Sequence, residues 1–533
     1  MFKRSSFVVG ALALAALSAR CGAPNSFSDG GSTFYDAGYQ GRDASGRSDV
    51  STTDAMLPPE IEEQRAFETP QAGGRYVYVA NPTRNTVAVI DATTLDLQTV
   101  EAGDGPRYLR TLDGRDEALV VNEGSDDVTI LRTDTHGTRS VTLPAARDAN
   151  AITIAPDGRH ALVWFDSSAP GAQLTSGSLQ DVTLLTLEEG HDASLGLSVG
   201  FRPLQVDFAR DGSAAFVITE DGLSILRFAD ITGPTILPSI SRGESDTGAA
   251  RDVSVAPDGR YAVARFEGSP VLELADLTAR TITSVDLGAP VTDVDLAPDG
   301  SFALAVLRDQ STVLRIPLPL GFTDVSRIVR TELPGETVGS VVIAPDALHA
   351  LVYTTAAPIV RITILDLAGT DAPDTVRLRK PIRAVAIAPD GHTALVIHTR
   401  LPGDPADPTI DLQTRIDRSY GYTLLDLPTG FAKLQLTGAE VGPFAIVPDG
   451  SAAFVLLSDP RQVIREVQRI SLRSFIIDPI TLGSPPLSVG VVPGSHRAFV
   501  GQDHPEGRIT FIDWTTGALQ SLTGFELNSR VVM

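Results

Sequence analysis

Apolar and polar positions alternate along most of the chain beyond residue 74, in short runs that end at tight turns. In one typical run, Val253 and Val255 stand six and four residues before Gly259, with polar residues on either side of Val253. Nearly every copy keeps these two positions apolar or aromatic. Alternation of this kind with β-branched residues is typical of a strand that has one face in a core. The pattern predicts short strands throughout and no helical solenoid.

The turn after each run is built from proline, aspartate and glycine. Proline fixes φ, aspartate accepts hydrogen bonds from nearby backbone amides, and glycine takes the positive φ that other residues resist. Complete copies lie at residues 156–158, 257–259, 298–300, 389–391 and 448–450. An alanine follows three residues later, which predicts a close approach of neighbouring backbones: Ala161, Ala215, Ala262, Ala303, Ala350, Ala394, Ala453 and Ala498.

Ten such units follow one another, about 47 residues apart, and each has room for four short antiparallel strands. This spacing predicts an all-β chain, a β-propeller of about ten four-stranded blades in one ring. The alternative is two smaller propellers, but no linker divides the units. The chain enters with a second strand near Arg75 and ends with a strand-like segment, residues 527–533. We therefore expect Val531 to pair beside residues 76–80 and close the ring without a free edge.

The first two units resemble a known repeat. Tyr78-Val79-Ala80-Asn81, and Val121-Asn122-Glu123-Gly124-Ser125 followed by Val128-Thr129-Ile130-Leu131, are similar to the YVTN-type β-propeller repeat. Later units keep the turn and lose the asparagine. The resemblance implies a propeller fold and an envelope or extracellular setting, and it implies no activity.

The N-terminus predicts export from a bacterial cell. Residues 1–20 carry Lys3-Arg4 and then an apolar stretch too short to span a bilayer, as in a signal peptide. Cys21, the single cysteine, stands where a lipoprotein would be lipidated, although Arg20 occupies a place normally held by a small residue. The alternative is a secreted protein cut after Ala19. Residues 21–71 are rich in Ser, Gly and Asp and predict a disordered tether, so that residues 72–533 form the propeller.

Charge limits the partners. The formal net charge is −23, which disfavours binding to nucleic acid or to anionic lipid by bulk attraction. Membrane contact is expected only through a lipid on Cys21. A protein or small-molecule ligand is expected, and the sequence does not identify it.

Four aspartates form the main candidate site. Asp207, Asp252, Asp293 and Asp295 lie on predicted first strands of three successive units, which line the channel of a propeller. Arg107 and Arg530 are expected on the opposite side of the channel. Crowded carboxylates favour a counter-cation, so the four aspartates predict a weak Ca²⁺ site. The alternative is that each aspartate accepts hydrogen bonds from the backbone of a neighbouring blade.

Two further features of the sequence contain residue types that can bind metals. Residues 403–417 form an insertion with four aspartates, which could bind Ca²⁺ but lack the spacing of an EF-hand loop. Four histidines recur just after the turns, on separate units, and are expected to be structural: His160, His349, His392 and His496. No nucleophile elbow or phosphate-binding glycine loop is present. The sequence favours a non-catalytic binding or scaffold protein of the cell envelope; the alternative is a propeller enzyme, a lactonase-like hydrolase or an oxidoreductase, with its site at the central channel.

Overall fold

A computed structural model describes residues 72–112, 114–169, 171–175, 177–237, 251–369, 371–459, 462–525 and 531–532. The predicted signal peptide, Cys21 and the tether lie outside these residues. No helix in the described ranges is long and apolar enough to cross a membrane.

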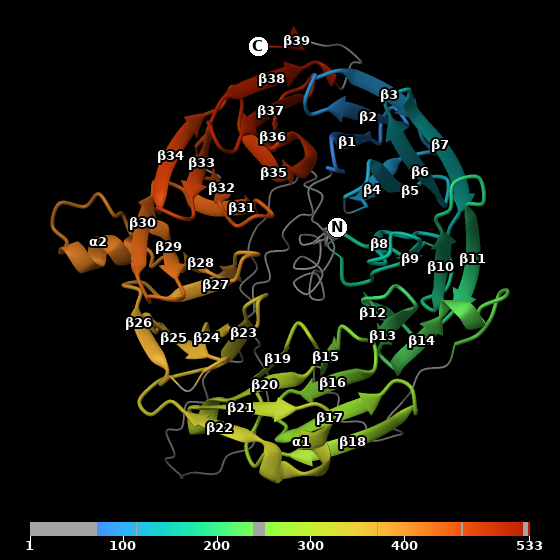
Figure 1. The fold of residues 1–533 in the computed structure, drawn as a ribbon. Coiled ribbons are helices and arrows are strands. Elements are labelled where there is room, and N and C mark those ends of the chain that lie inside the picture. Colours follow the sequence, from blue (N-terminus) through green and yellow to red (C-terminus); the bar gives the residue numbers. More distant parts are fainter. Residues whose placement is uncertain are drawn as a thin grey trace, which may run out of the picture.

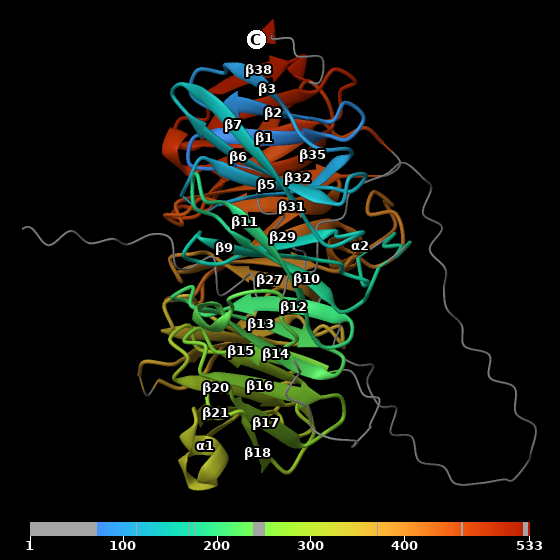
Figure 2. The ribbon, with the colours of Figure 1, turned by 90° about the vertical axis from the view of Figure 1, so that its right-hand side faces the viewer.

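The described strands form ten antiparallel sheets arranged as one ring (Figure 1). The first strand of each sheet lies beside the central opening and the last lies at the outer rim. Figure 2 shows the same ring from its side. The predicted single ten-bladed propeller is confirmed.

The strands follow the chain blade by blade. Blades 1 to 3 contain β1 (Tyr76–Asn81), β2 (Thr86–Asp91), β3 (Leu97–Glu101); β4 (Pro106–Thr111), β5 (Glu117–Asn122), β6 (Asp127–Asp134), β7 (Gly137–Pro144); and β8 (Ala151–Ile154), β9 (His160–Trp164), β10 (Asp181–Thr186), β11 (Ala193–Ser198). Blades 4 to 6 contain β12 (Pro203–Phe208), β13 (Ala214–Thr219), β14 (Gly222–Arg227); β15 (Arg251–Val255), β16 (Tyr261–Phe266), β17 (Val271–Asp276), β18 (Thr281–Asp286); and β19 (Asp293–Leu296), β20 (Phe302–Leu307), β21 (Thr312–Pro317), β22 (Val329–Glu332).

The second half of the ring repeats this order. Blades 7 and 8 contain β23 (Ser340–Ile343), β24 (His349–Tyr353), β25 (Arg361–Asp366), β26 (Asp374–Arg377); and β27 (Ile382–Ile387), β28 (Thr393–His398), β29 (Tyr420–Asp426), β30 (Ala432–Thr437). Blades 9 and 10 contain β31 (Glu440–Ile446), β32 (Ala452–Ser458), β33 (Glu466–Ser471), β34 (Ile476–Thr481); and β35 (Pro486–Val492), β36 (Arg497–Gln502), β37 (Arg508–Asp513), β38 (Leu519–Thr523), β39 (Val531–Val532). Two short helices, α1 (Leu320–Thr323) and α2 (Leu412–Arg418), interrupt the strands.

Turns of successive blades lie against one another, which explains the repeated glycine. Gly391 has φ +76°, and a Cβ at this position would lie 2.4 Å from the Asp346 carboxylate in the turn of the preceding blade. Gly450 meets Asp390 in the same way. The glycine is therefore needed for its backbone conformation and for the close contact between blades. The repeated alanine is equally constrained, since Ala161, Ala303 and Ala453 are fully buried.

The prediction of ring closure by the C-terminal strand is wrong. β39 pairs with β38, through Thr523 with Val531 and Leu522 with Val532, and so extends the outer edge of blade 10. An outer strand offers unpaired backbone groups to any short extended segment, so an apolar tail fits there as well as beside β1. Arg530 lies outside the described residues.

The first and last blades are instead joined by packing. Val77 and Ile90 of blade 1 form one apolar cluster with Phe499, Phe511 and Phe525 of blade 10. The turns add polar contacts: the amide of Gly494 donates to the Gly74 carbonyl at 2.7 Å, and Arg497 donates to the Ala92 carbonyl at 2.9 Å. Within the described residues, side-chain packing therefore closes the ring.

Candidate functional site

Asp293 and Asp295 join two blades. Both lie on β19, and one oxygen of each accepts a hydrogen bond from the amide of the following residue, at 2.8 and 2.9 Å. The other oxygen accepts from β23 in the next blade: the amide of Val341 donates to Asp293 and that of Ile343 to Asp295, both at 2.7 Å. For these two residues the backbone-acceptor alternative is confirmed.

The other two channel aspartates have side-chain partners. Gln205 donates its Nε2 to both oxygens of Asp207, each at 3.0 Å. Asp207 keeps part of its surface open to solvent, yet desolvation by the surrounding ring raises its pKa to about 7. Asp252 pairs with Arg265 on the adjacent strand of the same blade, at 3.3 Å.

The four aspartates do not gather around one point. The described residues contain no group of three or more His, Cys, Asp or Glu side chains that could hold a metal ion. Arg107 forms an ion pair with Glu123 at 3.2 Å, in which both side chains are largely exposed. The geometry of the described channel therefore gives no support to a shared Ca²⁺ site.

Two of the turn histidines take packing roles. The His160 ring stacks on Phe228 with 4.1 Å between ring centres, and His496 meets Trp514 edge-on at 5.1 Å. The first contact joins blade 3 to blade 4, and the second lies within blade 10.

The aspartates of the insertion close turns and cap a helix. Asp404 accepts from the amide of Ala406 at 2.8 Å, and Asp407 accepts from that of Thr409 at 2.9 Å. Asp411 is the N-cap of α2, where it accepts from the amide of Thr414 at 2.9 Å. These oxygens belong to three separate local motifs and do not converge.

Two cations fasten this insertion to blade 8. Lys380 is fully buried, and its Nζ donates to the carbonyls of Ile416 and Asp417 at the end of α2, at 2.7 and 3.1 Å. Arg400 donates to the Arg418 carbonyl at 2.7 Å and to the Gly403 carbonyl at 2.9 Å. The insertion is thus held at both ends by donors that satisfy its backbone carbonyls.

Burial changes the pKa values of Lys380 and His398. The pKa of Lys380 is lowered to about 8, mainly by desolvation; the Asp417 carboxylate opposes this shift and the nearby Arg400 cation adds to it. Desolvation also lowers the pKa of His398 to about 4, so its ring is neutral at pH 7. His398 Nδ1 lies 3.0 Å from the Pro381 carbonyl, which can only accept, so Nδ1 carries the proton and Nε2 accepts from the Thr423 hydroxyl at 2.7 Å.

Helix α2 itself lies at the surface of the protein. No residue of α2 is buried, and Leu412 is 71% exposed. In Figure 1, α2 projects from the outer rim of the ring beside β30. A buried lysine is unfavourable unless hydrogen bonds compensate for the loss of its hydration. Here the hydrogen bonds of Lys380 go to the end of α2, and no residue of α2 is buried.

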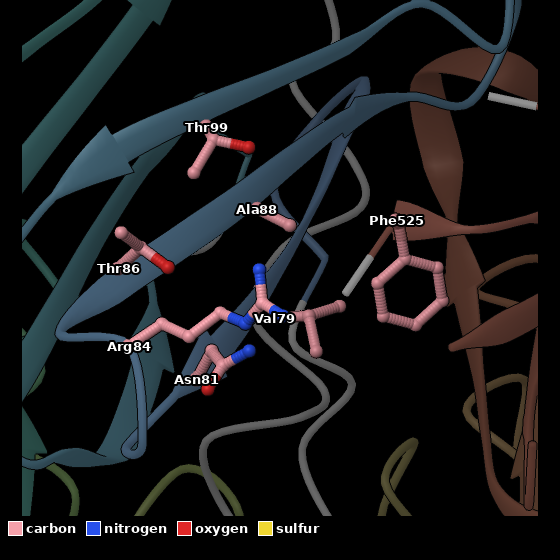
Figure 3. Close-up of a pocket in the computed structure, with 7 residues that line it drawn as sticks. All are labelled: Val79, Asn81, Arg84, Thr86, Ala88, Thr99 and Phe525. Atoms are coloured by element: carbon pink, nitrogen blue, oxygen red, sulfur yellow. The ribbon is translucent and has the colours of Figure 1, made fainter. Parts of the chain in front are cut away.

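A hollow of about 340 Å³ lies where blade 1 meets blade 10. Figure 3 shows its lining: Val79, Asn81, Arg84, Thr86, Ala88 and Thr99 from blade 1, and Phe525 from blade 10. The strand register places these blade 1 side chains in rows, because Val79 pairs with Ala88 and Ala88 with Thr99, while Asn81 pairs with Thr86. Cross-strand partners share a face of the sheet, so the lining forms one surface that is apolar toward the ring core and polar toward the turn.

Comparisons with known proteins do not assign the chain to a family. No family model matches the chain, and no curated protein matches its sequence. Among solved structures, dihydro-heme d1 dehydrogenase NirN in complex with DHE is 17% identical, with 71% of this chain and 75% of that chain covered and a TM-score of 0.42. A eukaryotic initiation factor is 11% identical (77% and 97% covered, TM-score 0.49), and the Kuenenia stuttgartiensis hydrazine synthase is 14% identical (62% and 95%, TM-score 0.33). These values support no statement about activity or partners.

The sequence analysis did not predict the contacts of Lys380 with the end of α2, nor the hollow between blades 1 and 10. Only three lysines occur in the chain, so the presence of Lys380 just before a first strand could have indicated a specific role for this side chain. The hollow left no such signal, because its lining residues are ordinary strand residues.

Proposed function

We propose that this protein is a non-catalytic binding or scaffold module of a bacterial cell envelope, exported and either lipid-anchored through Cys21 or secreted. The observation that carries the proposal is the insertion around α2, which the buried Lys380 and the half-buried Arg400 hold in place while no residue of α2 is itself buried. A rigid scaffold that presents a fixed projection suits recognition of a partner. The similarity of the first two units to the YVTN-type repeat supports the envelope setting.

The test is partner capture by matched variants of the full protein. Wild type, Leu412→Asp and Val329→Asp are immobilised and exposed to envelope extract, and bound proteins are quantified. Leu412 and Val329 are 71% and 58% exposed on different blades, so both substitutions add one surface charge without touching the core. We expect a set of proteins retained by wild type and Val329→Asp and lost with Leu412→Asp.

Other outcomes would redirect the proposal. Equal capture by all three proteins would exclude α2 as the contact. Hydrolysis of a lactone by wild type that disappears in Asp207→Asn would instead establish the enzyme alternative, because Asp207 is the channel carboxyl whose pKa lies near neutrality.

Anchoring is tested separately. If Cys21 is lipidated, the wild type will partition with membranes and Cys21→Ser will be recovered in the soluble fraction, with a matching loss of mass on the N-terminal peptide. An unmodified Cys21, or a mature chain that begins after Ala19, would establish the secreted form.

A further inference from the structure

The hollow between blades 1 and 10 combines a free cation with an apolar floor. Arg84 is exposed at the rim, and no described residue accepts a hydrogen bond from its guanidinium or forms an ion pair with it. The chain carries 66 acidic and 43 basic residues, so an unpaired cation beside a hollow is a favourable place for an added anionic ligand. Val79, Ala88 and Phe525 supply the apolar part, and Phe525 is 8% exposed.

The polar side chains surround the same space. In Figure 3, the Arg84 side chain runs above Asn81 and ends beside Val79, with Phe525 of the other blade beyond Val79. Thr86 and Thr99 place hydroxyl groups on the same face of the sheet. A guanidinium beside hydroxyl and amide groups matches a carboxylate, which accepts several hydrogen bonds and one ion pair.

The size of the hollow limits the occupant. A volume of about 340 Å³ lies at the lower end of the range for small-molecule sites, which is roughly 300–1,000 Å³. A peptide or a sugar chain is too large to be enclosed there. A compact organic acid with one aromatic or branched aliphatic group fits both the space and the division of the lining into apolar and polar parts.

We propose that this hollow binds a small organic carboxylate, with its acid group on Arg84 and its apolar body against Val79, Ala88 and Phe525. The inference deepens the proposed binding function, and it depends on residues of blades 1 and 10 only. Its site is therefore distinct from the insertion on blade 8.

The test uses 4-fluorobenzoate and its neutral amide, 4-fluorobenzamide, with ¹⁹F NMR of each probe in the presence of the full protein. Fragments of this size bind in roughly the millimolar range, so titration runs to about 10 mM. We expect 4-fluorobenzoate to bind at least about tenfold more tightly than the amide, because only the acid pairs with the guanidinium.

Charge variants assign the site. Arg84→Gln is expected to weaken 4-fluorobenzoate about tenfold and to leave the amide unchanged. Arg377→Gln is the matched control, because it removes one exposed cation from β26 on blade 7 and alters net charge equally. Glu101→Gln, on the same face as Thr86 by register, is expected to leave binding unchanged or to tighten it.

Three results would overturn the proposal: no binding of 4-fluorobenzoate at about 10 mM, equal affinity for acid and amide, or unchanged affinity in Arg84→Gln. Loss of anion binding in the Arg377→Gln control would likewise show that net charge and not the hollow is responsible. Protein partners captured through Leu412 would still support the binding function in each of these cases, so the two proposals fail separately.

Discussion

At the scale of single residues, most of the chemistry-bearing side chains hold the ring together. Asp293 and Asp295 accept amides from the next blade, and turn aspartates lie against turn glycines of their neighbours. Polar groups inside a packed ring must find partners, and backbone amides of the adjacent blade are the ones within reach. Asp207 differs, since both of its oxygens accept from the Gln205 amide group in the same strand.

Asp293→Asn tests the role of the two oxygens. Each oxygen accepts one backbone amide, so an asparagine would place its NH₂ against an N–H and leave one buried donor unsatisfied. We expect a loss of about 1–3 kcal/mol in the free energy of unfolding. The control is Asp207→Asn, whose partner can rotate to suit an amide. Equal stability of Asp293→Asn and wild type in thermal melts would contradict this role.

Asp207 gives the protein a pH dependence of stability. Its pKa is about 7 in the folded state and 3.8 when unperturbed, so the folded chain holds the proton more tightly. The corresponding stabilisation is complete below about pH 4 and is lost as pH rises through 7. Melting temperatures measured from pH 4 to 8 should therefore fall less steeply for Asp207→Asn than for wild type. Parallel curves for the two proteins would exclude Asp207 as the source.

Gly391→Ala tests the contact between turns. The substitution strains a φ of +76° and also drives a methyl group against Asp346, which is itself fixed by the amide of Leu348. Gly335→Ala is the matched control, because φ is +82° there and nothing lies within 4 Å of the new Cβ. Both should lose about 1–2 kcal/mol from backbone strain, and Gly391→Ala should lose more. Calorimetric melts that rank the two variants equally would show that the turns can move apart.

At the scale of elements, the insertion shows how a long loop becomes a fixed projection. Its aspartates close turns, Asp411 caps α2, and two basic side chains satisfy carbonyls at its ends. Long loops on rigid scaffolds often carry function. These hydrogen bonds hold the insertion in one conformation, which suits recognition of a partner.

Lys380→Met should separate local order from global stability. The methionine keeps the apolar stem but leaves the Ile416 and Asp417 carbonyls without their donor, so amides of residues 412–418 should exchange with solvent about tenfold faster. The melting temperature should not fall correspondingly, because a buried charge is removed at the same time. Lys433→Met is the control, since Lys433 donates to the Phe475 carbonyl elsewhere. Unchanged exchange in Lys380→Met would show that α2 does not depend on this lysine.

At the scale of the whole molecule, the ring closes through the apolar cluster between blades 1 and 10. Phe511 is fully buried in this cluster, whereas Val531 and Val532 are 54% and 45% exposed at the outer edge of blade 10. Loss of the tail should therefore matter much less than loss of one aromatic ring from the joint.

Truncation after residue 530 and Phe511→Ala are the two variants that test this. Phe511→Ala should lose about 3–5 kcal/mol, as expected when a buried aromatic side chain is removed. The truncation should shift the melting temperature only slightly, because β39 contributes two residue pairs. If the truncated protein melts at as low a temperature as Phe511→Ala, the C-terminal tail and not the apolar cluster would be what stabilises the closed ring.

The all-β class, the single ring and the count of ten blades can all be predicted from local sequence patterns. These properties follow from local features that repeat: alternating Val253 and Val255, the Pro-Asp-Gly turns and the alanine after them. Each feature specifies its own strand or turn through short-range sterics, and the period between copies sets the blade size.

The pairing of the tail, the contacts of the aspartates and the position of the hollow depend instead on how distant parts of the chain pack in the ring. A strand such as 531–532 fits any free edge, so its partner depends on which edge lies nearby. Asp293 and Asp295 look alike whether they face a cation or an amide of the next blade, because the sequence does not give the spacing between blades. The hollow is lined by Phe525 of blade 10 and by Val79 and Thr99 of blade 1, and residues so far apart in the chain meet only in the closed ring.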